Sequence, residues 1–152
     1  MRILVDANFI LRIAQPESPQ HPTAIAASVE LSQAGIEMCL VPQSLYEYWV
    51  VATRPVDVKG LGLSIRDVDS LVNELLNDFT LLRDERGIFT HWHDLVVRYS
   101  VHGKIAHDAR YVAAMQRHGL TNLLTFNRRD FTRYPGISVF TPEDILGGNL
   151  PS

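Results

Sequence analysis

The sequence contains a single cysteine, Cys39, so it can form no intramolecular disulfide framework and no cysteine-based zinc site. It has no apolar run near the roughly 20 residues that a membrane-spanning helix needs. A glycine-rich phosphate loop is also missing, because Gly60–Leu63 lacks the third glycine and the preceding strand. The start, Met1–Asp6, does not resemble a secretory signal, so we expect a cytoplasmic protein without a membrane partner.

The chain does have enough apolar residues to build a core. Its 152 residues are 46% hydrophobic and 20% charged, which is typical of a folded domain and not of a disordered chain. No repeat or linker divides it. We expect one domain over residues 1–146 and a C-terminal tail over residues 147–152.

Charge is distributed unevenly along the chain. The net charge is −3, yet residues 98–133 carry seven Lys and Arg against two Asp, a local charge of +5. A basic segment in an acidic chain is able to meet a polyanion such as a nucleic acid. The same arginines could equally be scattered over a solvated surface.

Short apolar segments alternate with helical patterns. Four segments are typical of strands buried on both faces of a parallel sheet: Ile3–Val5, Met38–Val41, Leu123–Thr125 and Ile137–Phe140. Helical patterns lie between and after them: Thr23–Ala34, a helix from near Ser44, one from Ser64 to Phe79, Ile105–Gln116 and a short one after Thr141. This alternation predicts an α/β fold with a mostly parallel sheet flanked by helices.

Four acidic residues lie near the ends of these elements. Asp6 follows the first strand, and Glu47 lies in the helix that starts near Ser44. Asp108 is close to the start of a later helix, and Asp130 follows the third strand. Ligands of open α/β sheets bind at the carboxyl ends of the strands, so these acids can meet at one edge.

Such a cluster needs a compensating charge. Two unit charges about 4 Å apart repel by about 4 kcal/mol at an effective dielectric of about 20. Carboxylate oxygens without a nearby thiol suit Mg²⁺ or Mn²⁺ better than zinc. A divalent ion can activate water and stabilise charge on a phosphoryl group, so the cluster predicts phosphodiester hydrolysis.

Each acid also has a purely structural interpretation. Glu47 completes a capping box with Ser44, in which it would bond back to the start of its helix. Asp108 lies near a helix N-terminus, where any acidic side chain is favourable. Asp130 could be a turn residue, and Asp6 could cap a short helix that follows it.

Four segments together resemble the PIN-domain family, and within it the VapC-like ribonucleases: Ile3–Leu11, Pro42–Glu47, Gly103–Ala114 and Leu124–Phe131. The resemblance spans nearly the whole chain. It implies a Rossmann-like, three-layer fold and Mg²⁺- or Mn²⁺-dependent cleavage of RNA. It also implies a toxin held inactive by a cognate antitoxin, and a homodimer.

Carried over residue by residue, the acidic cluster of the family falls on Asp6, Glu47, Asp108 and Asp130. The resemblance implies that Asp6 and Asp108 are the principal metal ligands, while Glu47 and Asp130 hold the attacking water or a second ion. The chain departs from the family pattern in its last motif. Many relatives have an acid two residues after the threonine that corresponds to Thr125, whereas this chain has Asn127 there. We take Asp130 as the fourth acid and Asn127 as a helper.

Three further residues complete the expected site. Asn8 is expected to position Asp6 by hydrogen bonding, and Arg128 and Arg129 are candidate contacts to RNA phosphates. The departure at Asn127 keeps an alternative open: a PIN fold without catalysis that binds nucleic acid or a protein. His91 and His93 form a His-x-His pair, but the further histidines of a binuclear metal site are missing from the expected positions.

Overall fold

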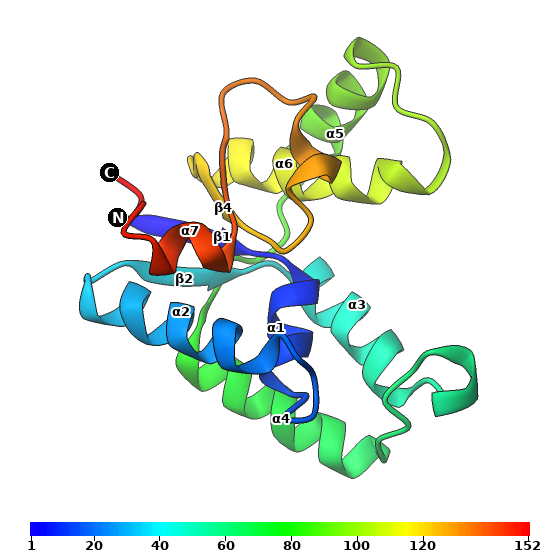
Figure 1. The fold of residues 1–152 in the computed structure, drawn as a ribbon. Helices are drawn as coiled ribbons and strands as arrows, with labels where there is room; N and C mark the ends of the chain where they lie inside the picture. Colours follow the sequence, from blue (N-terminus) through cyan, green and yellow to red (C-terminus); the bar gives the residue numbers. More distant parts are fainter.

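The apolar segments of the sequence form a five-stranded sheet in the computed structural model, which describes residues 1–152. The strands are β1 (Arg2–Val5), β2 (Glu37–Leu40), β3 (Thr80–Leu81), β4 (Asn122–Leu124) and β5 (Ser138–Phe140). Their order across the sheet is β3-β2-β1-β4-β5, and every neighbouring pair is parallel. The first strand of the chain is therefore the central one (Figure 1).

Alternation along β1 divides the core into two layers. Ile3 and Val5 are fully buried in one hydrophobic cluster, and Leu4 between them is fully buried in another. Side chains of a strand point to opposite faces in turn, so the sheet needs a cover on both sides. This explains why the buried part of the strand has no polar residue before Asp6.

Helices supply both covers. Five pack on the face of Ile3: α1 (Ala7–Ile13), α2 (His21–Gln33), α3 (Pro42–Thr53), α4 (Ile65–Asp78) and α7 (Pro142–Leu146). Two cover the opposite face, α5 (Gly87–Arg98) and α6 (Ala106–His118), as Figure 1 shows. Single 3₁₀ turns are η1 (Val56–Val58), η2 (Gly103–Ile105) and η3 (Arg128–Phe131). The predicted three-layer α/β fold is confirmed.

Local sequence features account for two of the helix ends. The Ser64 hydroxyl accepts a hydrogen bond from the Asp67 N–H at 3.1 Å and so caps α4. Gly119 ends α6 with φ of +69°, a left-handed conformation that glycine adopts without strain. No helix is long and apolar enough to cross a bilayer.

Two elements were not expected from the sequence, and helices α2 and α3 each begin earlier than predicted. The strand β3 and the helix α5 are additions. Helix α3 starts at Pro42 and not near Ser44. Proline at the first helical position loses nothing, since its missing N–H would have no partner there. Glu47 therefore lies in the second turn of α3.

Candidate active site

Asp6 lies at the carboxyl end of the central strand. Its side chain is buried, with 8% of the residue exposed, and its Oδ2 accepts a hydrogen bond from the Thr125 hydroxyl at 2.8 Å. Burial raises the pKa of Asp6 to about 6; the Thr125 hydrogen bond opposes this shift and the charge of Glu47 adds to it. Asp6 also stands at the N-cap of α1, but its side chain makes no capping hydrogen bond.

Thr125 is held so that its only hydroxyl hydrogen points at Asp6. The Thr125 oxygen accepts hydrogen bonds from the Asn8 side-chain amide at 3.1 Å and from the Asn127 N–H at 3.0 Å. Asn8 in turn accepts from the Phe126 N–H at 3.2 Å. Asn8 thus reaches Asp6 through Thr125, a residue that the sequence interpretation did not assign to the site.

Glu47 makes hydrogen bonds to side chains of α6 and of its own helix, and none to the backbone of Ser44. Its Oε2 accepts from the Tyr111 hydroxyl and its Oε1 from the Gln43 amide, both at 2.8 Å. The capping-box interpretation is therefore wrong. The hydroxyl of Ser44 donates to the Val5 carbonyl at 3.2 Å, which ties α3 to the end of β1.

Gln43 and Tyr111 were also missed by the sequence interpretation, although both lie in the segments that resemble the family. The Gln43 amide donates to the His107 carbonyl at 2.7 Å as well as to Glu47, so it links α3 to the residue before Asp108. Their positions follow from the packing of α3 against α6, for which the sequence carries no local signal.

Asp108 lies in the first turn of α6 and is half-buried. The pKa of Asp108 is raised to about 7. Burial is the largest cause, and the charges of Asp130, Asp6 and Glu47 add to it, whereas the charge of Arg133 lowers the pKa. Asp108 therefore lies near enough to Asp6, Glu47 and Asp130 for their charges to oppose its ionisation. Asp130, on η3, is the most exposed of the four.

The donor chemistry of this cluster fits a hard divalent cation, because it offers only oxygen atoms and its ionised forms repel one another. The observed side-chain positions do not enclose an ion: no group of three or more His, Cys, Asp or Glu side chains is arranged to hold one. Glu47 has both oxygens engaged in hydrogen bonds.

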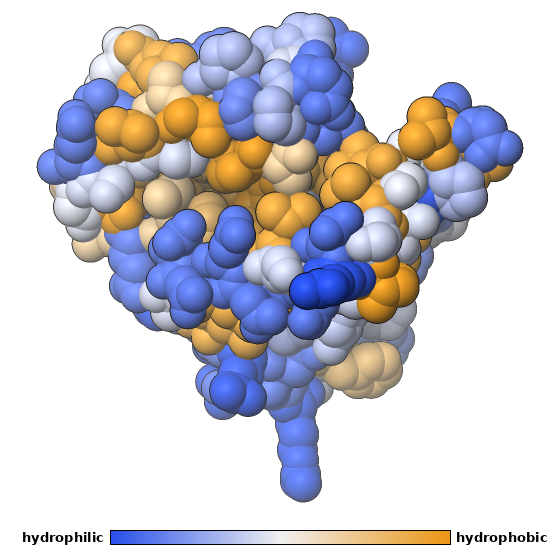
Figure 2. All heavy atoms as spheres, turned by 90° about the horizontal axis from the view of Figure 1, so that it is seen from below, coloured by the Kyte–Doolittle hydropathy of each residue, from blue (hydrophilic) through white to orange (hydrophobic).

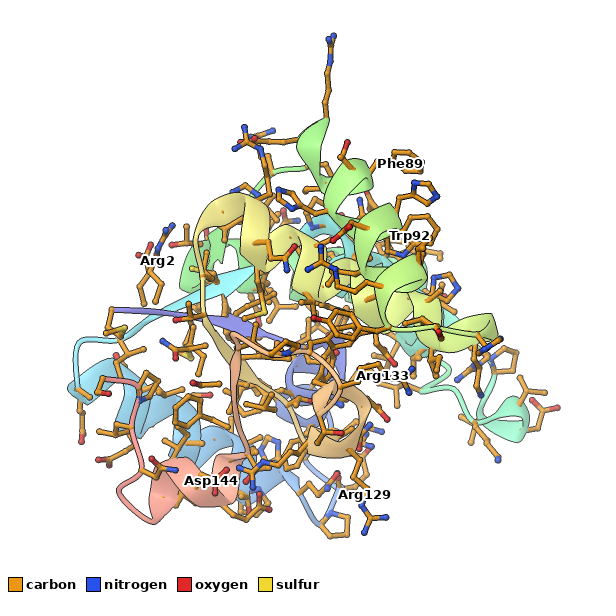
Figure 3. The ribbon with its side chains drawn as sticks, turned by 90° about the horizontal axis from the view of Figure 1, so that it is seen from above. Arg2, Phe89, Trp92, Arg129, Arg133 and Asp144 are labelled. Atoms are coloured by element: carbon orange, nitrogen blue, oxygen red, sulfur yellow. The ribbon has the colours of Figure 1, made fainter.

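The arginines expected to contact phosphate differ in their surroundings. Arg128 forms an ion pair with Asp144 and donates to the Val139 carbonyl, so its charge is already engaged. Arg129 is exposed and forms no ion pair. Arg133, which the sequence interpretation did not single out, is the cation that opposes the shift at Asp108. Arg129 and Arg133 both lie to the right of Asp144 in Figure 3, in the segment that contains and directly follows η3.

A separate hollow of about 530 Å³ lies between α1, α2 and α4. It is mostly hydrophobic, and its lining includes Ile10, Ile25, Val29, Leu71 and Leu75. Figure 2 views this side of the molecule and shows hydrophobic side chains gathered around a hollow, with hydrophilic ones outside it. Helix α1, which follows Asp6 directly, forms part of its wall.

The fold is similar to that of known toxin proteins. VapBC2 from Rickettsia felis, bound to a DNA fragment from its promoter, has a TM-score of 0.70 at 14% identity, covering 93% of this chain and 98% of that chain. VapC20 from Mycobacterium tuberculosis, a toxin that cleaves the sarcin–ricin loop, has a TM-score of 0.60 at 17% identity, covering 80% and 86%. A toxin–antitoxin complex from Klebsiella pneumoniae has a TM-score of 0.64 at 21% identity, and the match covers 92% of this chain and 97% of that chain.

The sequence itself gives a family match. No curated protein matches it. The model of the PIN domain matches residues 3–137, which include Asp6, Glu47, Asp108 and Asp130. A match over most of the chain, together with the all-parallel order of the sheet, identifies the family. This chain belongs to the PIN-domain family.

Proposed function

We propose that this protein is a divalent-metal-dependent endoribonuclease of the VapC-like toxin class. The observation that carries the proposal is the gathering of acids around buried Asp6 and half-buried Asp108 at the carboxyl end of the sheet. The charge of Glu47 adds to burial in raising the pKa of Asp6 to about 6, and the charges of Asp130, Asp6 and Glu47 add to burial in raising that of Asp108 to about 7. Acids that oppose one another's ionisation gain most from a shared cation. The toxin class is supported by the family and by the fold of its relatives.

Asp6 and Asp108 would hold Mg²⁺ or Mn²⁺, with Glu47 and Asp130 beside them. The ion supplies positive charge that offsets the carboxylates and stabilises charge on the phosphoryl oxygens. The chain contributes orientation: Thr125 fixes Asp6, while Tyr111 and Gln43 fix Glu47. Arg129 and Arg133 would contact the RNA phosphates.

Cleavage of a labelled RNA by the purified protein tests this proposal. We expect cleavage in Mn²⁺, none in EDTA, and a loss of at least about 100-fold in Asp6→Asn and in Asp108→Asn, the range found when one electrostatic contributor is removed from an active site. The matched control is Asp69→Asn, an exposed acid on α4, which should leave cleavage unchanged. Intact RNA together with no Mn²⁺ binding by calorimetry would identify a PIN fold without catalysis, the alternative that Asn127 favours.

The proposal includes a protein partner. A cognate antitoxin would dock an apolar segment into the hollow between α1, α2 and α4, whose composition matches such a segment. Because α1 follows Asp6 directly, an occupant of this hollow would act on the element that carries the active site. We further propose a homodimer, for which exposed apolar residues such as Tyr46 and Val50 on α3 offer a surface.

A further inference from the structure

A second hollow lies on the face of the sheet opposite to the apolar hollow between α1, α2 and α4. It has a volume of about 550 Å³ and lies between α5 and the start of α6. Phe89 and Trp92 from α5 and His107 and Arg110 from α6 contribute to its lining. Its size is within the range of small-molecule binding sites, so it can accommodate a single nucleotide.

The aromatic side chains of this hollow are held in place. The Trp92 indole donates a hydrogen bond to the Ala106 carbonyl at 2.8 Å, which fixes the ring against the first residue of α6. Phe89 packs against Trp92 and His93, with ring centroids 5.9 Å apart in both cases. Even so, Phe89 is 66% exposed. Figure 3 shows Phe89 and Trp92 projecting from the same side of α5. Phe89 thus presents an ordered aromatic ring to solvent.

The charges around the hollow favour an anionic ligand. Its acid, Glu85, is neutralised by an ion pair with Arg117, and Arg110 is paired with Asp84. Arg86 on the rim of the hollow forms no ion pair. An uncompensated cation beside an exposed aromatic ring is the combination by which proteins bind single-stranded nucleic acids.

The hollow adjoins the surface around Glu47 through shared lining residues. His107 and Arg110 line both this hollow and a neighbouring one that contains Glu47 and the unpaired Lys104. The His107 carbonyl is hydrogen-bonded to the Gln43 side chain, which also contacts Glu47. A strand whose phosphate lies at the carboxylates would therefore pass Lys104 and His107 before it reaches Phe89.

We infer that the hollow between α5 and α6 is a nucleobase-binding subsite, in which Phe89 stacks on an unpaired base of single-stranded RNA close to the phosphodiester that is cleaved. Arg86 and Lys104 contact the adjoining phosphates. The inference rests on the proposed ribonuclease function and adds a substrate class to it, RNA with an unpaired base near the cleaved bond. Stacking selects for an unpaired base because a paired base is not free to leave its helix.

Binding of a short, unstructured, fluorescein-labelled RNA tests the inference. The full chain is used in the non-cleaving Asp6→Asn background with Mn²⁺, and affinity is measured by anisotropy. Phe89→Ala should weaken binding by about 5- to 150-fold, the equivalent of about 1–3 kcal/mol for one stacked base. Phe89→Tyr keeps the ring and should bind normally. Val97→Ala removes an apolar side chain that is 68% exposed on the same helix and should also bind normally.

Two further measurements separate stacking from a general structural effect. In the first, a series of RNAs is made in which each RNA lacks the base at one position. One RNA of the series should bind poorly to the protein with Phe89 intact, and Phe89→Ala should weaken the binding of that RNA no further. In the cleaving background, Phe89→Ala should raise KM and leave kcat unchanged, because Phe89 lies away from the reacting atoms.

The outcomes distinguish this inference from the proposed function. If the unmodified chain cleaves RNA and Phe89→Ala leaves the affinity for RNA unchanged, the subsite is overturned and the proposed ribonuclease function stands. Absence of both RNA binding and cleavage in every variant would overturn both. A change in oligomeric state by sedimentation, with unchanged RNA affinity, would show that Phe89 contacts protein and would overturn the subsite.

Discussion

Replacing Asp6 by asparagine should stabilise the metal-free protein at neutral and alkaline pH. The folded state raises the pKa of Asp6 from 3.8 to about 6, chiefly through burial. Between these values the folded protein binds more protons than the unfolded chain, so its stability falls as the pH rises through this window. The contribution of the protonated form is fully present below about pH 4 and is lost above about pH 6.

The magnitude follows from the shift. At about 1.36 kcal/mol for each pKa unit, ionised Asp6 costs the folded state at most about 3 kcal/mol. Asparagine carries no charge and keeps an oxygen that can accept the Thr125 hydrogen bond. For a chain of this size, about 3 kcal/mol corresponds to an increase in Tm of about 6–12 °C.

Thermal and urea unfolding of the two proteins in EDTA at pH 4 and pH 8 measures this effect. We expect Asp6→Asn to be more stable at pH 8 and nearly equal to the unmodified protein at pH 4. The free energy of unfolding of Asp69→Asn should differ from that of the unmodified protein by less than about 0.5 kcal/mol at both pH values, as is usual for an exposed position. Adding Mn²⁺ at pH 8 should raise the Tm of the unmodified protein only. A destabilised Asp6→Asn at pH 8 would refute the reasoning, since it would mean that the ionised carboxylate of Asp6 is not destabilised by its surroundings.

Other residues of the site give further predictions. Tyr111→Phe removes a hydroxyl donor to Glu47 and should slow RNA cleavage about 10-fold or more at saturating Mn²⁺, with circular dichroism unchanged; full activity would mean that Glu47 needs no such support. Arg129→Ala should weaken RNA binding and reduce the slope of log K against log salt concentration by about 1. Arg128→Ala should have a smaller effect on both, because the charge of Arg128 is already paired with Asp144. A larger effect of Arg128→Ala would contradict the assignment. Val29→Glu, in the apolar hollow, should prevent neutralisation by a cognate antitoxin in a growth assay and leave RNA cleavage by the purified protein unchanged.

Local sequence patterns were sufficient for most of the fold. The strand β1 was predicted at residues 3–5 and observed at Arg2–Val5, because a short apolar run ending in an acid fits only a strand covered on both faces. The strand β3 was missed because its two residues, Thr80–Leu81, carry no periodicity. Helix α5 was missed although Ile88 and Leu95 have helical spacing and are buried.

The sequence alone determined which residues end the parallel strands, and hence that acids from distant segments share one edge of the sheet. The hydrophobic period and the alternation of strands with helices are properties of the sequence itself, so they can be predicted from a single chain. The assignment of Asp6, Glu47, Asp108 and Asp130 to a metal site remains a prediction.

Only the tertiary structure decided which partners those acids have. Thr125 turns its hydroxyl to Asp6 because Asn8 and the Asn127 N–H occupy its other bonding positions. Tyr111 reaches Glu47 because α6 and α3 meet across the end of the sheet, a contact between residues 64 positions apart. Hydrogen-bond direction and burial depend on how whole helices pack, and no local run of residues encodes that arrangement.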